Sequence, residues 1–346
     1  MAFISFKPSD YFNTKLYTGN GSTQTISGVG FQPDMTWIKD RDASEAQTLF
    51  DSTRGVTKRL YVNSDAAEST SAISLTAWNS DGFALGAGGE VNTNNDKFVS
   101  WNWKAGTTSG LSGGTITPSS YSYNVTTGFG IYKWSGTGSA GTIAHGLGKV
   151  PQMILLKRLD TTYSWFGYFD KLGSSKNLSI NLTNAAGNAG AGIWNSTSAT
   201  NTVFSVGNDD GVNLGSGTYV AYVWCNVAGS SSIGEYTGNG NASGTFIYTG
   251  FRPQFFIAKE SNAVDPWHSW TGNVSTSGAN NINKSIQPND VSAEATDNNK
   301  DVDFLASGVK LRTSNSEING SGSPYIYMAW AAEPIVGSGG TPGVAR

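Results

Sequence analysis

The chain has 346 residues, of which only 14% are charged, and a formal net charge of −3 at pH 7. This balance, without a local cluster of Lys and Arg, excludes the basic surface that binds nucleic acid, and no apolar stretch is long enough to span a bilayer. Frequent Gly and aromatic residues favour short strands and tight turns over long helices. Cys225 is the single cysteine, which excludes an intrachain disulfide and predicts a buried thiol.

The same spacing of Gly, Pro and Lys around a short apolar run occurs three times, at Gly30–Lys39, Gly148–Lys157 and Gly250–Lys259. A second shared run closes each segment, at Phe98–Trp103, Tyr219–Trp224 and Tyr325–Trp330. The chain therefore consists of three diverged copies of one unit, each about the size of a domain. The predicted boundaries are 1–107, with an N-terminal docking segment, 108–228, with a linker, and 229–346, with a polar Gly-rich tail.

Each copy predicts a buried strand directly after its proline. These strands are Met35–Ile38, Met153–Leu156 and Phe255–Ala258, which are short, apolar and bounded by turn signals. The lysine after each run is expected to mark the strand leaving the core. The closing runs alternate large aromatic with small or β-branched residues, which predicts a central strand covered on both faces. The expected fold is all-β, with three tandem antiparallel β-sandwich domains, jelly-roll-like, that together form a rod.

Turn signals fall in the middle of each copy. Asn79–Gly86 and Asn208–Gly215 contain Asp-Gly, and Ser307–Leu311 is a weaker form of the same pattern. Asp-Gly suits the positive φ angles of a two-residue hairpin turn. We therefore predict a hairpin in each copy and interpret these aspartates as turn residues, not as metal ligands.

The first copy resembles a repeat found in tail-associated and fibre-like proteins of marine bacteriophages. The resemblance is carried by Phe6–Thr14, Gly28–Asp34, Trp37–Lys39, Asp51–Gly55, Asn79–Phe83 and Trp101–Gly106, and by Ala144–Gly148 in the second copy. It covers nearly all of the first copy but only the shared anchors of the other two. It implies a virion structural protein that faces the host, and it brings no catalytic residue with it.

The sequence contains few residue patterns typical of enzymes, and we expect neither catalysis nor a cofactor. His145 lies in a Gly-rich turn, where a structural role is favoured, and a triad around His268 would need a geometry that the sequence does not specify. Asp297–Asp303 places oxygen ligands at alternate positions. The Gly and terminal Glu of a calcium loop are missing and Lys300 interrupts the segment, so a solvated loop is favoured over a calcium site.

A glycan-binding site is favoured over the catalytic and calcium sites. Trp165, Trp194, Trp267 and Trp270 lie outside the shared strands, in segments that differ between the copies. Variable loops on a repeated scaffold often carry binding residues, and flat aromatic rings suit sugars. The alternative is that these tryptophans pack against a neighbouring repeat or subunit.

These observations favour a non-enzymatic virion protein, assembled in the host cytoplasm, because the start of the chain shows no export signal. A tail fibre or tail-associated receptor-binding protein is preferred, with host-surface glycan and other virion proteins as partners and avidity from a homotrimer. The alternatives are a capsid decoration protein, a bacterial lectin or adhesin module, and a polysaccharide depolymerase. Met1–Asn13 is expected to dock onto the particle, and Gly337–Gly343 to order only against a partner.

Overall fold

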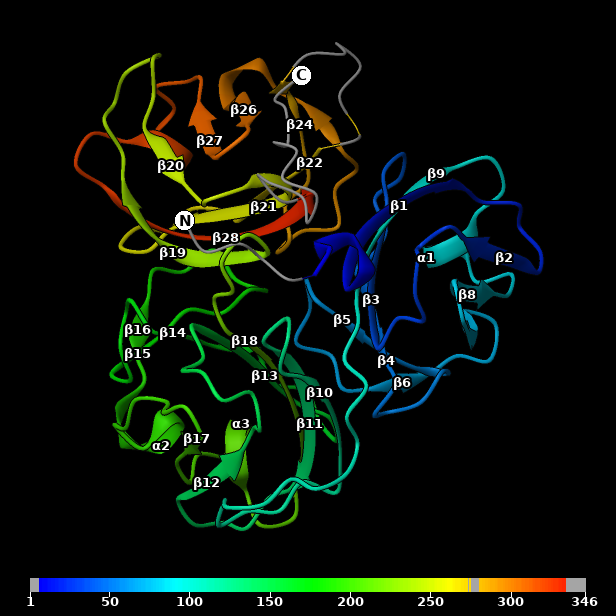
Figure 1. The fold of residues 1–346 in the computed structure, drawn as a ribbon, viewed down its shortest axis with the longest axis vertical. Helices are drawn as coiled ribbons and strands as arrows, with labels where there is room; N and C mark the ends of the chain where they lie inside the picture. Colours follow the sequence, from blue (N-terminus) through cyan, green and yellow to red (C-terminus); the bar gives the residue numbers. More distant parts are fainter. Residues whose placement is uncertain (1–5, 273, 275–279, 334–346) are drawn as a thin grey trace.

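The computed structural model describes residues 6–272, 274 and 280–333. It is mostly β and built of antiparallel sheets, as the sequence predicts. Figure 1 shows three lobes, one for each repeat, that meet at a common centre. The predicted rod is therefore wrong, because the repeats surround one another instead of following in line. The tail Gly337–Gly343 and the first five residues lie outside the described part of the chain.

The first repeat has a large sheet in the order β1-β9-β3-β4-β5-β6 and a small sheet in the order β2-β8-β7. Its elements are η1 (Pro8–Asp10), β1 (Phe12–Thr18), β2 (Gln24–Ser27), β3 (Met35–Asp40), β4 (Thr48–Asp51), β5 (Lys58–Tyr61), β6 (Ser69–Thr70), β7 (Leu75–Asn79), β8 (Gly82–Leu85), α1 (Gly89–Asn92) and β9 (Lys97–Trp103).

The second repeat has a large sheet in the order β10-β11-β18-β13-β14 and two small pairs, β12-β17 and β15-β16. Its elements are β10 (Ser120–Asn124), β11 (Phe129–Ser135), β12 (Gly141–Ala144), β13 (Met153–Arg158), β14 (Phe166–Phe169), β15 (Lys176–Asn177), β16 (Gly187–Asn188), α2 (Gly190–Trp194), β17 (Val203–Val206), α3 (Asp210–Asn213) and β18 (Thr218–Trp224).

The third repeat has a large sheet in the order β19-β28-β21-β22, a small sheet in the order β20-β27-β26-β23, and the pair β24-β25. Its elements are β19 (Ser231–Thr237), β20 (Phe246–Tyr248), β21 (Arg252–Glu260), β22 (His268–Thr271), β23 (Asn281–Ile282), β24 (Lys284–Ser285), β25 (Ala295–Thr296), η2 (Asn298–Lys300), β26 (Val302–Leu305), β27 (Gly308–Leu311), α4 (Ser316–Asn319) and β28 (Pro324–Glu333).

The three large sheets share one plan. In each, the closing strand pairs on one side with the first long strand and on the other with the strand after the proline. The prediction that the closing strand is central and covered on both faces is confirmed, since six of the seven residues of β9 are buried. The register makes Trp103, Trp224 and Trp330 equivalent, because each pairs with the residue two places after its repeat's proline.

Each large sheet has a core on both faces. One core lies between the large sheet and the small sheet of the same repeat, and the other is shared by all three repeats. Trp103, Trp224 and Trp330 meet in this shared core, with ring centroids 6.1, 5.3 and 6.1 Å apart in near edge-to-face pairs. The cavity left among the apolar residues there measures only about 20 Å³, so the repeats pack closely against one another.

The contacts between the repeats follow a cyclic order. The amide of Glu68 in the first repeat donates to the carbonyl of Leu159 in the second at 2.9 Å. The same bond joins equivalent positions of the second and third repeats and of the third and first, as Ala186 to Ser261 at 2.8 Å and Glu294 to Arg41 at 2.9 Å. Head-to-tail contacts of this kind form a closed ring when their rotation closes. One chain therefore builds an arrangement that otherwise requires a trimer.

The hairpin predictions hold in two of the three copies. β7 and β8 form a hairpin around Ser80-Asp81, and β26 and β27 form another around Ala306-Ser307. The prediction for Asn208–Gly215 is wrong, because this segment contains the short helix α3. The side chain of Asp209 caps that helix by accepting a hydrogen bond from the amide of Gly211 at 2.8 Å.

The three lysines expected to leave the core are instead fully buried. Each ammonium group donates to backbone carbonyls, and in two repeats one of these carbonyls belongs to the neighbouring repeat. Burial lowers the pKa of each lysine to about 8, although nearby carboxylates oppose this shift. The bonds run from Lys39 to Ala43 (2.9 Å) and Val291 (3.1 Å), from Lys157 to Arg158 (2.8 Å) and Asp65 (3.2 Å), and from Lys259 to Ala263 (2.9 Å) and Glu260.

These lysines predict that the free energy of unfolding rises between pH 8 and pH 9. The unfolded chain keeps its lysines protonated to about pH 10.5, whereas the folded chain releases the protons near pH 8. The unfolded state therefore binds more protons, and each lysine adds about 1 kcal/mol over this interval. Cys225 opposes part of this rise, because burial raises its pKa to about 12 while the thiol of the unfolded chain loses its proton near pH 8.5. The three lysines together outweigh this single thiol.

Urea unfolding at pH 8.0, 8.5 and 9.0 measures this slope. Lys39→Met should reduce the slope by about a third, whereas the matched change at the exposed Lys97 (64% of its side chain accessible) should leave it unchanged. A flat or falling free energy of unfolding in the wild-type protein would contradict the assignment.

Candidate ligand groove between the first and second repeats

The four tryptophans predicted to contact glycan are all buried, with at most 1% of each residue accessible. A sugar ring has no access to side chains that are this enclosed. The structure therefore contradicts the glycan prediction for Trp165, Trp194, Trp267 and Trp270 and supports the packing alternative.

Two of these tryptophans join neighbouring repeats. The indole N–H of Trp165 donates to the carbonyl of Tyr61 at 3.0 Å, and that of Trp267 donates to the carbonyl of Ser179 at 3.0 Å. Gln47 occupies the equivalent position of the first repeat and donates to Gln287 of the third at 2.6 Å. Because two residue types fill this one position, the equivalence is hidden in the sequence.

The other two tryptophans lie inside their own repeats. Trp194 ends α2 and packs edge-on against Tyr168, with ring centroids 5.6 Å apart. Trp270 lies on β22, and its indole N–H donates to the carbonyl of Lys300 at 3.0 Å. Both belong to the core between the sheets of one repeat.

The histidines also have structural contacts. Nδ1 of His145 accepts a hydrogen bond from the amide of Leu147 at 3.2 Å, which confirms the predicted turn role. Nε2 of His268 lies 2.6 Å from the carboxylate of Glu317. The hydroxyl of Ser269 donates to a backbone carbonyl, so His268 and Ser269 do not form the nucleophile and base of a triad.

In the segment Asp297–Asp303, two of the three carboxylates pair with cations of the chain itself and the third, that of Asp301, accepts a hydrogen bond from the amide of Asn281. Asp297 pairs with Lys300 at 3.1 Å and Asp303 pairs with Arg312 at 3.2 Å. Within the described residues, no group of three or more acidic, His or Cys side chains is arranged to hold a metal ion. In the same part of the chain, no helix has the length and apolar character to cross a membrane.

A groove of about 610 Å³ lies at the junction of the first and second repeats. We call it the junction groove. Its polar groups are mainly hydroxyl and backbone groups, with a single carboxylate and a single ammonium group. The lining residues are Gln32, Asp34, Ser52, Thr53, Lys104, Ala105, Gly106, Thr108, Ser119, Ser120, Tyr121 and Ser122.

Asp34 organises the floor of the junction groove. Its carboxylate accepts hydrogen bonds from the hydroxyl of Ser52 at 2.7 Å, the hydroxyl of Ser122 at 3.0 Å and the amide of Ala105 at 2.8 Å. Ser122 belongs to the second repeat, so these bonds fix one wall of the groove relative to the other. Among the lining residues no second carboxylate stands opposite Asp34, so the pair that glycoside hydrolysis uses is not assembled there.

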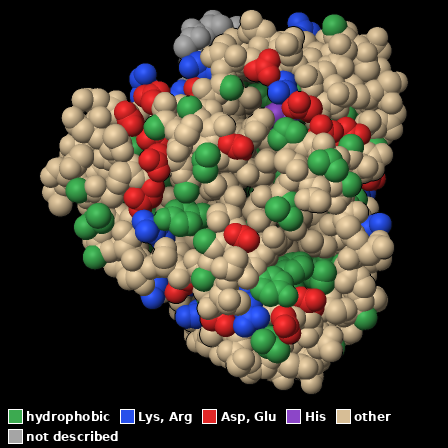
Figure 2. All heavy atoms as spheres, turned by 180° about the vertical axis from the view of Figure 1, so that it is seen from behind, with side chains coloured by type: hydrophobic (Ala, Val, Ile, Leu, Met, Phe, Trp, Pro, Cys, Tyr) green, Lys and Arg blue, Asp and Glu red, His purple; other side chains and the backbone are tan. Residues whose placement is uncertain are grey.

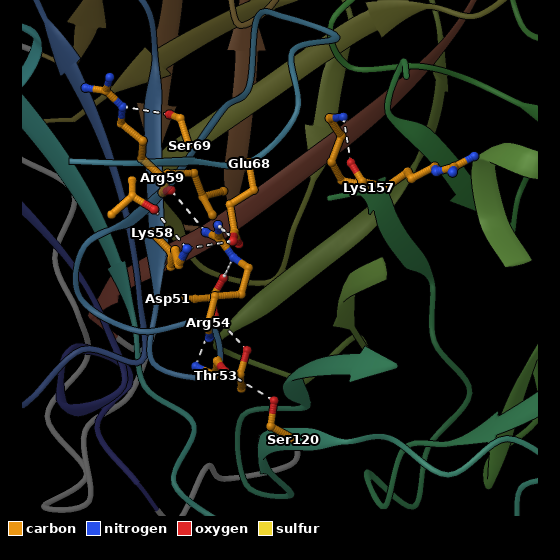
Figure 3. A network of polar contacts seen from close by, with 12 residues as sticks. Asp51, Thr53, Arg54, Lys58, Arg59, Glu68, Ser69, Ser120 and Lys157 are labelled. Carbon is orange, nitrogen blue, oxygen red and sulfur yellow. Dashed lines mark hydrogen bonds and ion pairs between the residues drawn. The ribbon is translucent and has the colours of Figure 1, made fainter. Parts of the chain in front are cut away.

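A buried ionic network adjoins the lining of the groove through Thr53 and Ser120 (Figure 3). The guanidinium of Arg54 pairs with Asp51, both side chains being fully buried, and also with Glu68 at 3.2 Å. The hydroxyl of Tyr222, from the second repeat, donates to Asp51 at 2.5 Å. The hydroxyl of Ser120 donates to the carbonyl of Thr53 at 3.1 Å, which links the network to the lining.

The network fixes the charge states of its members. Burial alone would raise the pKa of Asp51, but the charge of Arg54 and the hydrogen bonds from Thr53 and Tyr222 outweigh burial and hold this pKa below its usual value. Burial and the adjacent carboxylate raise the pKa of Tyr222 well above its usual value. Asp51 is therefore a fixed anion and Tyr222 a fixed donor.

The junction groove has only a weak signal in the sequence. Its second-repeat wall is the hydroxyl-rich run Ser119–Ser122, which begins just after the interrepeat linker. The partners of this run, Thr53 and Asp34, lie 67 and 88 positions earlier in the chain, and no local pattern places them together.

Surface charge offers no competing site on the face opposite the view of Figure 1. In Figure 2, Lys and Arg side chains lie beside Asp and Glu and do not merge into one basic patch. This face therefore lacks a field that would attract nucleic acid.

Comparison with known proteins agrees with a unit made of all three repeats. Residues 7–334 match a family described as a domain of unknown function, DUF7483. No curated protein and no solved structure matches the chain. Because the match covers the whole ring of repeats, the chain belongs to the DUF7483 family.

Proposed function

We propose that this chain is a non-enzymatic bacteriophage virion protein that binds a host-surface glycan in the junction groove. The observation that carries the binding role is the groove itself, an open concavity of about 610 Å³ lined by hydroxyl and amide groups around a fixed carboxylate. The virion role rests on the resemblance of the first repeat to tail-associated and fibre-like phage proteins.

The lining suits a neutral or weakly charged sugar. The hydroxyls of Ser52, Ser120 and Ser122 donate within the protein and can accept hydrogen bonds from sugar hydroxyls, whereas the amide of Gln32 can both donate and accept. Lys104 adds a donor. Such contacts are weak singly, and many copies on one particle would strengthen them through avidity.

A tail fibre or tail-associated protein remains the preferred place in the virion, and a capsid decoration protein the alternative. Counting this chain on purified particles by quantitative mass spectrometry separates them. A few tens of copies would support the tail, and hundreds would support decoration.

The proposal extends to the architecture of each repeat and to the assembly of the chain. We interpret each repeat as a β-sandwich of jelly-roll type, with its small sheet as the outer layer. A homotrimer would then combine three rings, and its mass would be three times the 36.4 kDa of one chain. Light scattering on the purified protein tests this assembly.

A glycan array with purified protein tests the groove. Ser119→Trp places an indole in the groove and should abolish binding of every glycan that the groove holds. Ser22→Trp is the matched control, because Ser22 is exposed in a turn of the first repeat and should keep full binding. Retained binding by Ser119→Trp, or an array without any bound glycan, would refute the proposed role.

A further inference from the structure

Two aromatic side chains lie exposed on the outermost strand of the third repeat. Phe246 is 44% exposed and Tyr248 is 68% exposed, while Ile247 between them is 3% exposed and belongs to the core. The alternation of β20 therefore directs both rings to the outer face of the small sheet. Exposed aromatic pairs of this size on a soluble protein call for an explanation.

Neither of the other repeats has this pair. The strand register makes Phe246 and Tyr248 equivalent to Thr25 and Ser27 in the first repeat, because Tyr248 and Ser27 each pair with the glycine that follows the hairpin turn. The same register in the second repeat gives Thr142 and Ala144. The fold thus accepts small residues at both positions, and packing does not require the aromatic rings.

Glycines let the two rings lie close to the backbone. A Cβ atom at Gly308, on the neighbouring strand, would come within 2.9 Å of Cζ of Phe246, so this ring reaches across that strand. A Cβ atom at Gly250 would lie 3.7 Å from the hydroxyl of Tyr248. Gly250 has a φ of 83°, which favours glycine. Rings held low over the backbone present their faces, not only their edges, to an approaching ligand.

Polar groups adjoin the rings on the same face. In the sheet register Phe246 stands next to Lys310, and Lys310 next to Asp303. Asp303 also pairs with Arg312 at 3.2 Å, where half of the arginine side chain is accessible. Donors and an acceptor therefore lie beside the aromatic pair, all on strands β20, β26 and β27 or at their ends.

We propose that this outer face of the third repeat is a second carbohydrate site, in which Phe246 and Tyr248 stack against pyranose rings. Lys310 and Asp303 would supply hydrogen bonds to the sugar hydroxyls. Aromatic faces attract the C–H face of a sugar. The ammonium of Lys310 also donates to the carbonyl of Gly244, which holds it beside the rings. The site is independent of the junction groove and lies on a different repeat.

The test transfers the residues of the first repeat to the third. Phe246→Thr with Tyr248→Ser reproduces Thr25 and Ser27, which the same fold already carries in exposed positions. On a glycan array, at least one glycan bound by the wild-type protein should lose about tenfold or more of its binding in this double variant. The same glycan should be bound normally by Ser119→Trp, which blocks only the junction groove.

Several results would overturn the proposal. One is a wild-type protein that binds no glycan, and another is a double variant that binds every glycan as the wild type does. A double variant that keeps all glycan binding but no longer joins the particle would instead identify the face as a protein contact. If the junction groove does not bind glycan but the third repeat does, Ser119→Trp leaves glycan binding unchanged while the double variant still loses it. This result would refute the groove proposal and keep the present one. Circular dichroism and the melting temperature of the double variant confirm that it folds.

Discussion

Residues 108–228, expressed alone, are expected not to fold, although they contain one complete repeat. The large sheet of this repeat buries one face only against the other two repeats. Phe129, Ile131, Leu155 and Trp224 are among the side chains that would be exposed in the fragment. Exposing each of these side chains to water costs about 1.5–3 kcal/mol of folding free energy. The summed cost is comparable with the whole free energy of unfolding of a typical domain, about 5–15 kcal/mol.

The fragment should therefore lack cooperative urea unfolding, give poorly dispersed amide NMR signals and bind hydrophobic dyes. The control keeps all three repeats but cuts the chain, by placing a protease site in the exposed linker at Gly110. The cut protein should stay assembled, because the contacts between repeats do not depend on the connecting chain. A fragment that is monomeric and unfolds cooperatively would show that the repeats are independent domains.

The sequence predicted the strands well because their signals are local. Turn residues bound each strand after the proline, and alternation in the closing run predicted burial on both faces. That second buried face already required a partner beyond the repeat's own small sheet. The identity of the partner did not follow, because residues such as Glu68 and Leu159 meet across about ninety positions of sequence.

The errors concern residue types whose usual place differs from their place here. Lysine is rarely buried, so the sequence predicts that Lys39 and its two equivalents leave the core, whereas backbone carbonyl oxygens satisfy them inside it. Trp165 and Trp267 lie in segments that differ between the copies, because Gln47 takes their position in the first repeat. The exposed pair Phe246 and Tyr248 has no local signal, and only the strand register sets it against Thr25 and Ser27.

One pair of equivalent positions recurs at all three interfaces between repeats, and the type of contact made there differs at each interface. Tyr222 donates to Asp51 between the second and first repeats, and Trp101 donates to Thr271 at 3.1 Å between the first and third. The equivalent pair of the third and second repeats is Met328 and Phe169, which are both apolar members of the shared core. An ionic contact at this position is therefore not a requirement of the fold.

Asp51→Ala is expected to lower the free energy of unfolding by about 3–5 kcal/mol, since it leaves a buried charge without its partner. The guanidinium of Arg54 is fully buried and would keep Glu68 as its one carboxylate partner, beside the carbonyl of Leu49. The hydroxyl of Tyr222 would lose its acceptor, and the amides of Thr53 and Arg54 would lose theirs. Urea unfolding at pH 7 measures the loss, and an effect below 1 kcal/mol would show that water or backbone movement satisfies the arginine.

A triple variant, Asp51→Phe, Arg54→Leu and Tyr222→Met, removes the three buried members of the network and installs the apolar residues found at the equivalent positions Phe169, Leu172 and Met328. Its free energy of unfolding is expected to lie within about 1.5 kcal/mol of that of the wild type, because replacing a buried ionic group by well-packed apolar residues is often neutral or stabilising. Glu68 keeps Lys58 as a partner, at 3.6 Å. Recovery in the triple variant, set against the loss in Asp51→Ala, would show that the cost comes from the stranded charge and not from loss of an attraction that the ring requires. A triple variant as unstable as Asp51→Ala would instead show that the ionic network itself stabilises this interface.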